Sequence, residues 1–101
     1  MVTVIFRSRL RADAGPDYAA TAARLLELAR SMPGFVSFRH YEAPDGERLA
    51  LIEFASEEAL RAWREHPEHR EAQRRGREEW YAWFRLTTCQ RLREVVFGEE
   101  R

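Results

Sequence analysis

Cysteine, lysine, asparagine and long apolar runs are scarce or missing in this sequence, and each absence argues against a class of protein. The single cysteine, Cys89, cannot form an internal disulfide, so we expect a reducing environment and a cytoplasmic location. There is no run of about 18 apolar residues and no charged leader before an apolar segment, so we expect neither a membrane span nor export. The 17 basic residues, all Arg, balance 17 acidic residues. We therefore expect no nucleic-acid partner, because phosphate binding requires a concentrated positive face.

Motifs of the common catalytic and metal sites are missing as well. The sequence has no Gly-rich phosphate loop, no calcium loop, no HExxH and no GxSxG around Ser8. His66 and His69 flank Pro67 without a third strong ligand nearby, so we expect no metal site. Cys89 has no activating base beside it, and we expect it to be a small strand residue rather than a nucleophile. Because these motifs are missing, motifs alone do not identify a reaction for this protein.

The composition is that of one folded domain. Hydrophobic residues make up 45% of the chain and charged residues 34%, which is typical of a globular domain. At this length the core is thin, and association with a second copy would help to stabilise it. We predict a single domain over residues 1–97, followed by a frayed tail over residues 98–101.

The periodicity of apolar residues predicts the secondary structure. Alternation with a period of two predicts strands over residues 2–11, 35–42, 48–54 and 85–96. An apolar stripe at helical spacing predicts a helix over residues 16–29, which ends before Pro33. Ser56 is a suitable N-cap for a second helix, which the His66-Pro67 pair interrupts. The helical pattern then resumes and continues to Phe84.

This order of elements predicts a ferredoxin-like α+β sandwich, in which a four-stranded antiparallel sheet carries its helices on one face. Apolar side chains nevertheless fall on both faces of the strands; in the first strand, Val4 and Phe6 alternate with Ile5. The helices can cover only one face, so the other would be an exposed apolar patch. We therefore predict a homodimer that packs sheet to sheet.

The segment over residues 54–84 is predicted to form the wall of a pocket above the sheet, because it contains all three tryptophans and two of the three histidines. The predicted substrate-binding residues are Val4, Phe6, Ser8, Phe54, Trp63 and Tyr81. The candidate general bases are His66, His69 and His40. Core packing is the alternative role for the aromatic residues. For the histidines, the alternative is that His66 caps the helix break while His69 is solvated.

Nearly the whole chain resembles a known family. The stretch MPGFVSFRHYEAPDGERLALIEFASEEALRAWREHPEHREAQRRGREEWY resembles the antibiotic biosynthesis monooxygenase (ABM) domain family, and its most specific parts are PGF, EFASEEALRAW and HPEHREAQRRG. The resemblance implies a ferredoxin-like fold assembled as a dimeric α+β barrel, with a pocket between the sheet and the helices.

The resemblance also implies which activities to consider. Some family members are cofactor-free oxygenases of polycyclic phenols or quinol-like substrates, and others bind and degrade haem. Haem degraders carry Asn, Trp and His at positions that fall on Ser8, Trp63 and Gln73 here, with His69 one helical turn before Gln73. Oxygenases of polyketide pathways carry Trp, Tyr and Asn at positions that fall on Phe54, Leu60 and Trp63.

From the pocket and the resemblance we predict a cofactor-independent monooxygenase of a small aromatic, phenolic or quinone-like substrate. A dry apolar pocket with one base would suffice for a phenolate or enolate to react with oxygen. The alternatives are a non-catalytic dimer that binds a small hydrophobic ligand and, third, a haem-binding or haem-degrading protein.

Overall fold

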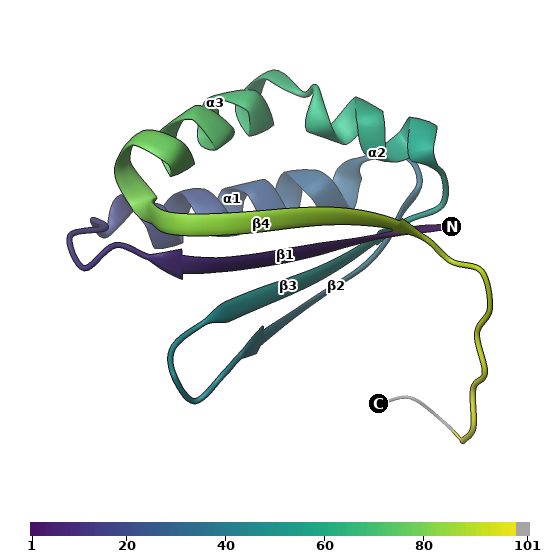
Figure 1. Cartoon of the computed structure of the whole chain (residues 1–101). Helices are drawn as coiled ribbons and strands as arrows, with labels where there is room; N and C mark the ends of the chain where they lie inside the picture. Colours follow the sequence, from purple (N-terminus) through teal and green to yellow (C-terminus); the bar gives the residue numbers. More distant parts are fainter. Residues whose placement is uncertain (99–101) are drawn as a thin grey trace.

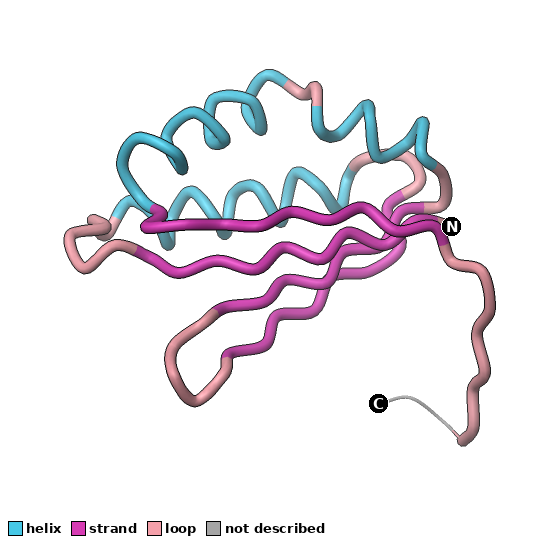
Figure 2. Tube along the Cα trace, in the orientation of Figure 1, coloured by secondary structure: helices cyan, strands magenta, loops and turns pink. Residues whose placement is uncertain are grey.

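Four antiparallel strands form one sheet, and the helices pack on one of its faces (Figure 1, Figure 2). This arrangement is seen in the computed structural model, which describes residues 1–98 of the chain. The elements follow in the order β1 (Val2–Leu10), α1 (Asp17–Ser31), β2 (Phe35–Glu42), β3 (Arg48–Phe54), α2 (Glu57–Arg64), α3 (Pro67–Arg75), the π-helical turn η1 (Gly76–Trp80) and β4 (Tyr81–Gln90). The sheet order is β2-β3-β1-β4, with every neighbouring pair antiparallel. The predicted ferredoxin-like α+β fold is confirmed.

The predicted domain boundary at residue 97 stays a prediction. Residues 99–101 of the predicted tail lie outside the described part of the chain. Within residues 1–98, no helix has both the length and the apolar character that crossing a membrane requires.

Two side-chain caps mark the starts of α2 and α3 at the positions that the sequence predicts. The Ser56 hydroxyl accepts a hydrogen bond from the backbone N–H of Ala59 at 3.1 Å and so caps α2. His66 caps α3 in the same way, because its Nδ1 accepts from the backbone N–H of Glu68 at 3.1 Å. Pro67 follows as the first residue of α3, where its missing N–H costs nothing. The break between α2 and α3 therefore lies at the predicted position.

The prediction of a final strand over residues 85–96 is wrong, and so is the continuation of the helix to Phe84. β4 begins at Tyr81 and ends at Gln90. Its limits follow from its partner β1, since Leu10 lies opposite Tyr81 and Val2 lies opposite Gln90. Beyond Gln90, β1 offers only the carbonyl of the residue before Val2 as an acceptor, so residues 91–97 form neither strand nor helix.

The core lies between the sheet and the helices. Phe54 at the end of β3 is fully buried, and Phe35 meets it edge to face at a centroid distance of 5.8 Å. The buried cluster consists of Val2, Val4, Ala29, Phe54, Leu60 and Trp63. Gly34 holds the chain close to α2 with φ +86°, and a Cβ built there would lie 2.6 Å from the Cβ of Ala59. A glycine is therefore required at this approach.

The face of the sheet opposite the helices carries exposed apolar side chains, as the strand alternation predicts. Ile5 and Leu51 lie opposite each other in the β1–β3 register. On the flanking strands, Tyr41 is 49% exposed and Trp83 is 38% exposed. After β4 the chain continues past the sheet on the side away from the helices (Figure 1). Its apolar side chains there are also exposed, with Phe97 fully so.

Candidate functional site

An apolar cavity of about 370 Å³ lies between the sheet and the helical layer. Strands β1, β3 and β4 form its floor, and residues of α1, α2, α3 and η1 form its walls. A volume of this size falls at the lower end of the range for small-molecule sites, about 300–1,000 Å³. The cavity continues the core, because Val4, Phe54 and Trp63 belong to both.

Most of the predicted substrate-binding residues meet at this cavity. Val4, Phe6, Phe54, Trp63 and Tyr81 all contribute to its lining. Sequence alternation and strand register explain this, since Val4 and Phe6 point to the helical face beside the end of β3.

Ser8 is the exception among the predicted lining residues. It lies on the same face of β1 but is only 2% exposed and does not reach the cavity surface. The position is packed as part of the protein interior, and a ligand role for Ser8 stays a prediction.

His69 is the one histidine within residues 1–98 that lines the cavity. Its ring stacks on Trp63 at a centroid distance of 4.3 Å and an interplanar angle of 12°. Its Nδ1 lies 3.2 Å from the carbonyl oxygen of Trp63. A carbonyl can only accept a hydrogen bond, so Nδ1 carries the proton and Nε2 keeps its lone pair. The alternative that His69 is solvated is wrong, because the turn at Pro67 places it against Trp63.

Burial lowers the pKa of His69 below its ordinary value of 6.5, because the charged imidazolium is disfavoured away from water. The hydrogen bond to the Trp63 carbonyl opposes this shift, and the neighbouring His66 adds to it. The ring is therefore neutral at pH 7 and presents an unprotonated nitrogen.

The other two candidate bases lie elsewhere. His66 is committed to capping α3, as the structural alternative predicts, and it does not line the cavity. His40 lies on β2 opposite Ala50, also away from the cavity. Burial, followed by the charge of Arg48, lowers the pKa of His40.

Two tyrosines form a polar pair in the cavity wall. The Tyr81 hydroxyl lies 3.5 Å from the hydroxyl of Tyr18 on α1, to which it donates a long, weak hydrogen bond. Burial, and then this contact, raises the pKa of Tyr81 well above its ordinary value. Tyr81 therefore stays protonated and serves as a donor rather than a base. Gly76 permits the arrangement, since a Cβ there would lie 2.9 Å from the Tyr81 ring.

Sequence reasoning missed several lining residues on the helices. Tyr18 was visible only as the first member of the apolar stripe of α1. Arg64, Gln73 and Arg77 also line the cavity. They belong to a run in which arginine and glutamate alternate, and no sequence signal distinguishes them from solvated neighbours. The Arg77 guanidinium lies 5.6 Å from the ring centroid of Phe84, over the cavity wall.

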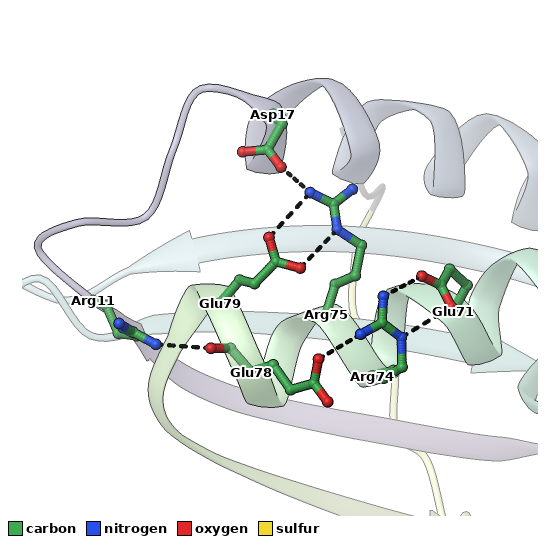
Figure 3. A network of polar contacts seen from close by, with 7 residues as sticks. All are labelled: Arg11, Asp17, Glu71, Arg74, Arg75, Glu78 and Glu79. Carbon is green, nitrogen blue, oxygen red and sulfur yellow. Dashed lines mark hydrogen bonds and ion pairs between the residues drawn. The ribbon is translucent and has the colours of Figure 1, made fainter.

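A network of ion pairs fastens α3 and η1 to their surroundings (Figure 3). Arg75 bonds both Asp17 on α1 and Glu79 on η1. Arg74 bonds Glu78 in the same turn of helix. Surface pairs of this kind are individually worth about 0–1 kcal/mol, but here they connect one wall of the cavity to another.

The described residues thus form an α+β fold with an apolar cavity between the sheet and the helices, and comparison with known proteins identifies the family. The sequence model described as antibiotic biosynthesis monooxygenase matches residues 1–75, and the chain belongs to this family. The chain is 31% identical over 96 residues to the uncharacterized protein YqjZ of Bacillus subtilis (strain 168), covering 95% of this chain and 83% of YqjZ.

Solved structures share the fold. Rv0793 from Mycobacterium tuberculosis is similar with a TM-score of 0.81 and 26% identity, over 94% of this chain and 98% of Rv0793. A mutant of SnoaB, a cofactor-independent oxygenase from Streptomyces nogalater, is similar with a TM-score of 0.77 and 16% identity, over 93% of this chain and 95% of SnoaB. At that identity the likeness to SnoaB shows the fold alone.

Proposed function

We propose that the protein is a cofactor-independent monooxygenase of a small aromatic, phenolic or quinone-like substrate, with His69 as its general base. The observation that carries the proposal is the neutral imidazole at the wall of an apolar cavity, with Nδ1 bonded to the Trp63 carbonyl and Nε2 left as an acceptor. Membership of the monooxygenase family supports it.

The cavity residues suit a reaction that starts with loss of a proton. A phenol that gives its hydroxyl proton to Nε2 of His69 becomes a phenolate, which can pass one electron to O₂. Recombination of the two radicals forms a carbon–oxygen bond and, with the proton, a hydroperoxide. Loss of water from this hydroperoxide leaves a carbonyl, so one oxygen atom enters the product and the other leaves as water. The substrate supplies all four electrons, so no external reductant is required.

The chain's own residues would favour this first step. Trp63 holds the imidazole in one tautomer, which fixes the site of proton transfer at Nε2. Apolar walls exclude water, which strengthens electrostatic interactions inside the cavity. Tyr81 remains a hydroxyl and can donate to a developing oxyanion in a bound substrate.

Oxygen uptake tests the proposal. A panel of anthrones and hydroquinones is added to the protein, and uptake is compared with the rate for each substrate alone. We expect at least one substrate to give uptake above its spontaneous rate. If ligands bind and no substrate gives such uptake, the protein is a non-catalytic binder of small hydrophobic molecules.

The residues present do not support the hypothesis that the protein binds or degrades haem. In the family resemblance, haem degraders use an Asn at the position of Ser8, and Ser8 is buried outside the cavity surface. We expect a haemin titration to give no stoichiometric shift of the Soret band. A stoichiometric shift that disappears on His69→Gln would contradict this and restore haem as the ligand.

The proposal includes a homodimer formed through the open face of the sheet. Ile5, Leu51, Tyr41 and Trp83 would be covered by the same residues of a second copy. The exposed segment over residues 91–97 leaves the sheet on this side and would add contact area (Figure 1).

Leu51→Glu tests the homodimer. We expect sedimentation to show the wild type at twice the mass of one chain at micromolar concentration, and Leu51→Glu as a monomer, because two carboxylates would be buried without partners. Ala62→Glu is the matched control, since Ala62 lies exposed on α2. A wild type that sediments as a monomer would rule out this interface.

A further inference from the structure

The charged side chains that line the cavity are all cationic within the described part of the chain. Arg64 and Arg77 contribute to the lining, and no aspartate or glutamate does. No carboxylate among residues 1–98 lies within ion-pair distance of either guanidinium. The cavity lining among the described residues thus includes two exposed cationic side chains and no carboxylate.

The carboxylates of α3 and η1 are committed to other arginines. Glu68 bonds Arg24. Glu71 and Glu78 bond Arg74, and Glu79 bonds Arg75 (Figure 3). Every carboxylate of α3 and η1 is therefore engaged outside the cavity lining. Arg77 lies between these residues in sequence, yet its guanidinium lies over Phe84 instead.

The uncharged polar groups of the lining do not decide the charge of the ligand. Nε2 of His69 is an acceptor, whereas the Tyr81 hydroxyl already donates to Tyr18. Gln73 and Thr88 can each both donate and accept. The preference for an anion therefore rests on the two arginines.

We infer that the ligand of this cavity is an aromatic acid, whose ring system lies against the apolar floor and whose carboxylate meets one guanidinium of the lining, that of Arg77 or Arg64. The inference rests on the proposed function, because it places the reacting ring in the same cavity as His69. Arginine suits this role, since its planar guanidinium binds a carboxylate through two parallel hydrogen bonds. Arg64 and Arg77 are both exposed residues, so we expect such a contact to be worth about tenfold in affinity.

A matched pair of probes tests the charge requirement. Naphthoate and naphthamide share a ring system and nearly the same shape, and only naphthoate carries a charge. Their dissociation constants are measured by calorimetry at low salt for the wild type. We expect naphthoate to bind at least about tenfold more tightly, and a rise in salt to reduce this preference.

Three glutamine variants test which arginine causes the preference for naphthoate over naphthamide. Arg77→Gln or Arg64→Gln, whichever removes the guanidinium that meets the carboxylate, should reduce the naphthoate preference by about tenfold and leave naphthamide affinity unchanged. Arg70→Gln, on the exposed surface of α3 and outside the cavity lining, should change neither. Unchanged naphthamide affinity also shows that the variants are folded.

The outcomes separate the two proposals. Equal binding of the two probes, or a preference that survives in both Arg77→Gln and Arg64→Gln, overturns the aromatic acid while the oxygenase proposal stands. If neither probe binds, the inference fails, and the oxygen-uptake panel then decides the proposed function by itself.

Discussion

Replacing His69 by Gln should lower substrate-dependent oxygen uptake by about 10²–10⁴-fold, which is the range that a positioned general base contributes. Glutamine is close in size to histidine, and its amide can still donate to the Trp63 carbonyl that now holds Nδ1. It has no basic nitrogen, however, so proton removal would depend on water. The measurement is the uptake rate at saturating substrate, with the spontaneous rate subtracted.

The pH dependence of the wild type gives a second readout of the same group. The pKa of His69 is lowered from 6.5 by burial, so Nε2 is available at every pH above this lowered value. The rate should therefore rise as pH increases through a value below 6.5 and then level off, until the substrate itself ionises. His69→Gln should lack this rise.

His40→Gln is the matched control, because the pKa of His40 is also lowered by burial but the ring lies outside the cavity. This variant should keep the wild-type rate and pH profile. If His69→Gln retains more than half of the wild-type rate, His69 is not the base. A loss of activity in His40→Gln that equals the loss in His69→Gln would indicate a general effect on the fold.

The fold could be predicted from the sequence because its signals are local. Alternation in the first three strands, the cap at Ser56 and the break at Pro67 act over a few residues, and each is found where expected. The start of β4 is different, since aromatic residues such as those over 80–84 are compatible with a helix or a strand. Only pairing with β1 decides between them, and this pairing is not visible from the local sequence.

In the site, too, some residues could be predicted from local sequence, while others depend on contacts between distant parts of the chain. Val4, Phe6 and Phe54 could be placed on one face from alternation alone. The tautomer of His69 depends on a backbone carbonyl six residues earlier, which periodicity does not reveal. Arg77 could not be predicted, because the arginines of a charged run look alike until the positions of their carboxylate partners are known.

Replacing Trp63 by Ala should lower the free energy of unfolding by about 3–5 kcal/mol, the usual cost of truncating a large buried aromatic residue. Trp63 is 7% exposed and packs in the core cluster, so its removal would join a new void to the existing cavity. For a domain of this size the melting temperature should fall by about 12 °C or more. Thermal melts at one fixed protein concentration measure this, since dissociation of a dimer would otherwise shift the midpoint.

Trp63→Phe separates packing from ligand contact. Phenylalanine keeps an aromatic face for His69 and most of the buried volume, so we expect only a minor loss of stability, about 1–2 kcal/mol. The backbone carbonyl that bonds Nδ1 is unaffected by either substitution, so the tautomer of His69 should persist in both. A small change in melting temperature for Trp63→Ala would show that Trp63 is not part of the core. If Trp63→Phe folds as expected but loses oxygen uptake, the indole contacts the substrate, because the fold and the tautomer of His69 are kept.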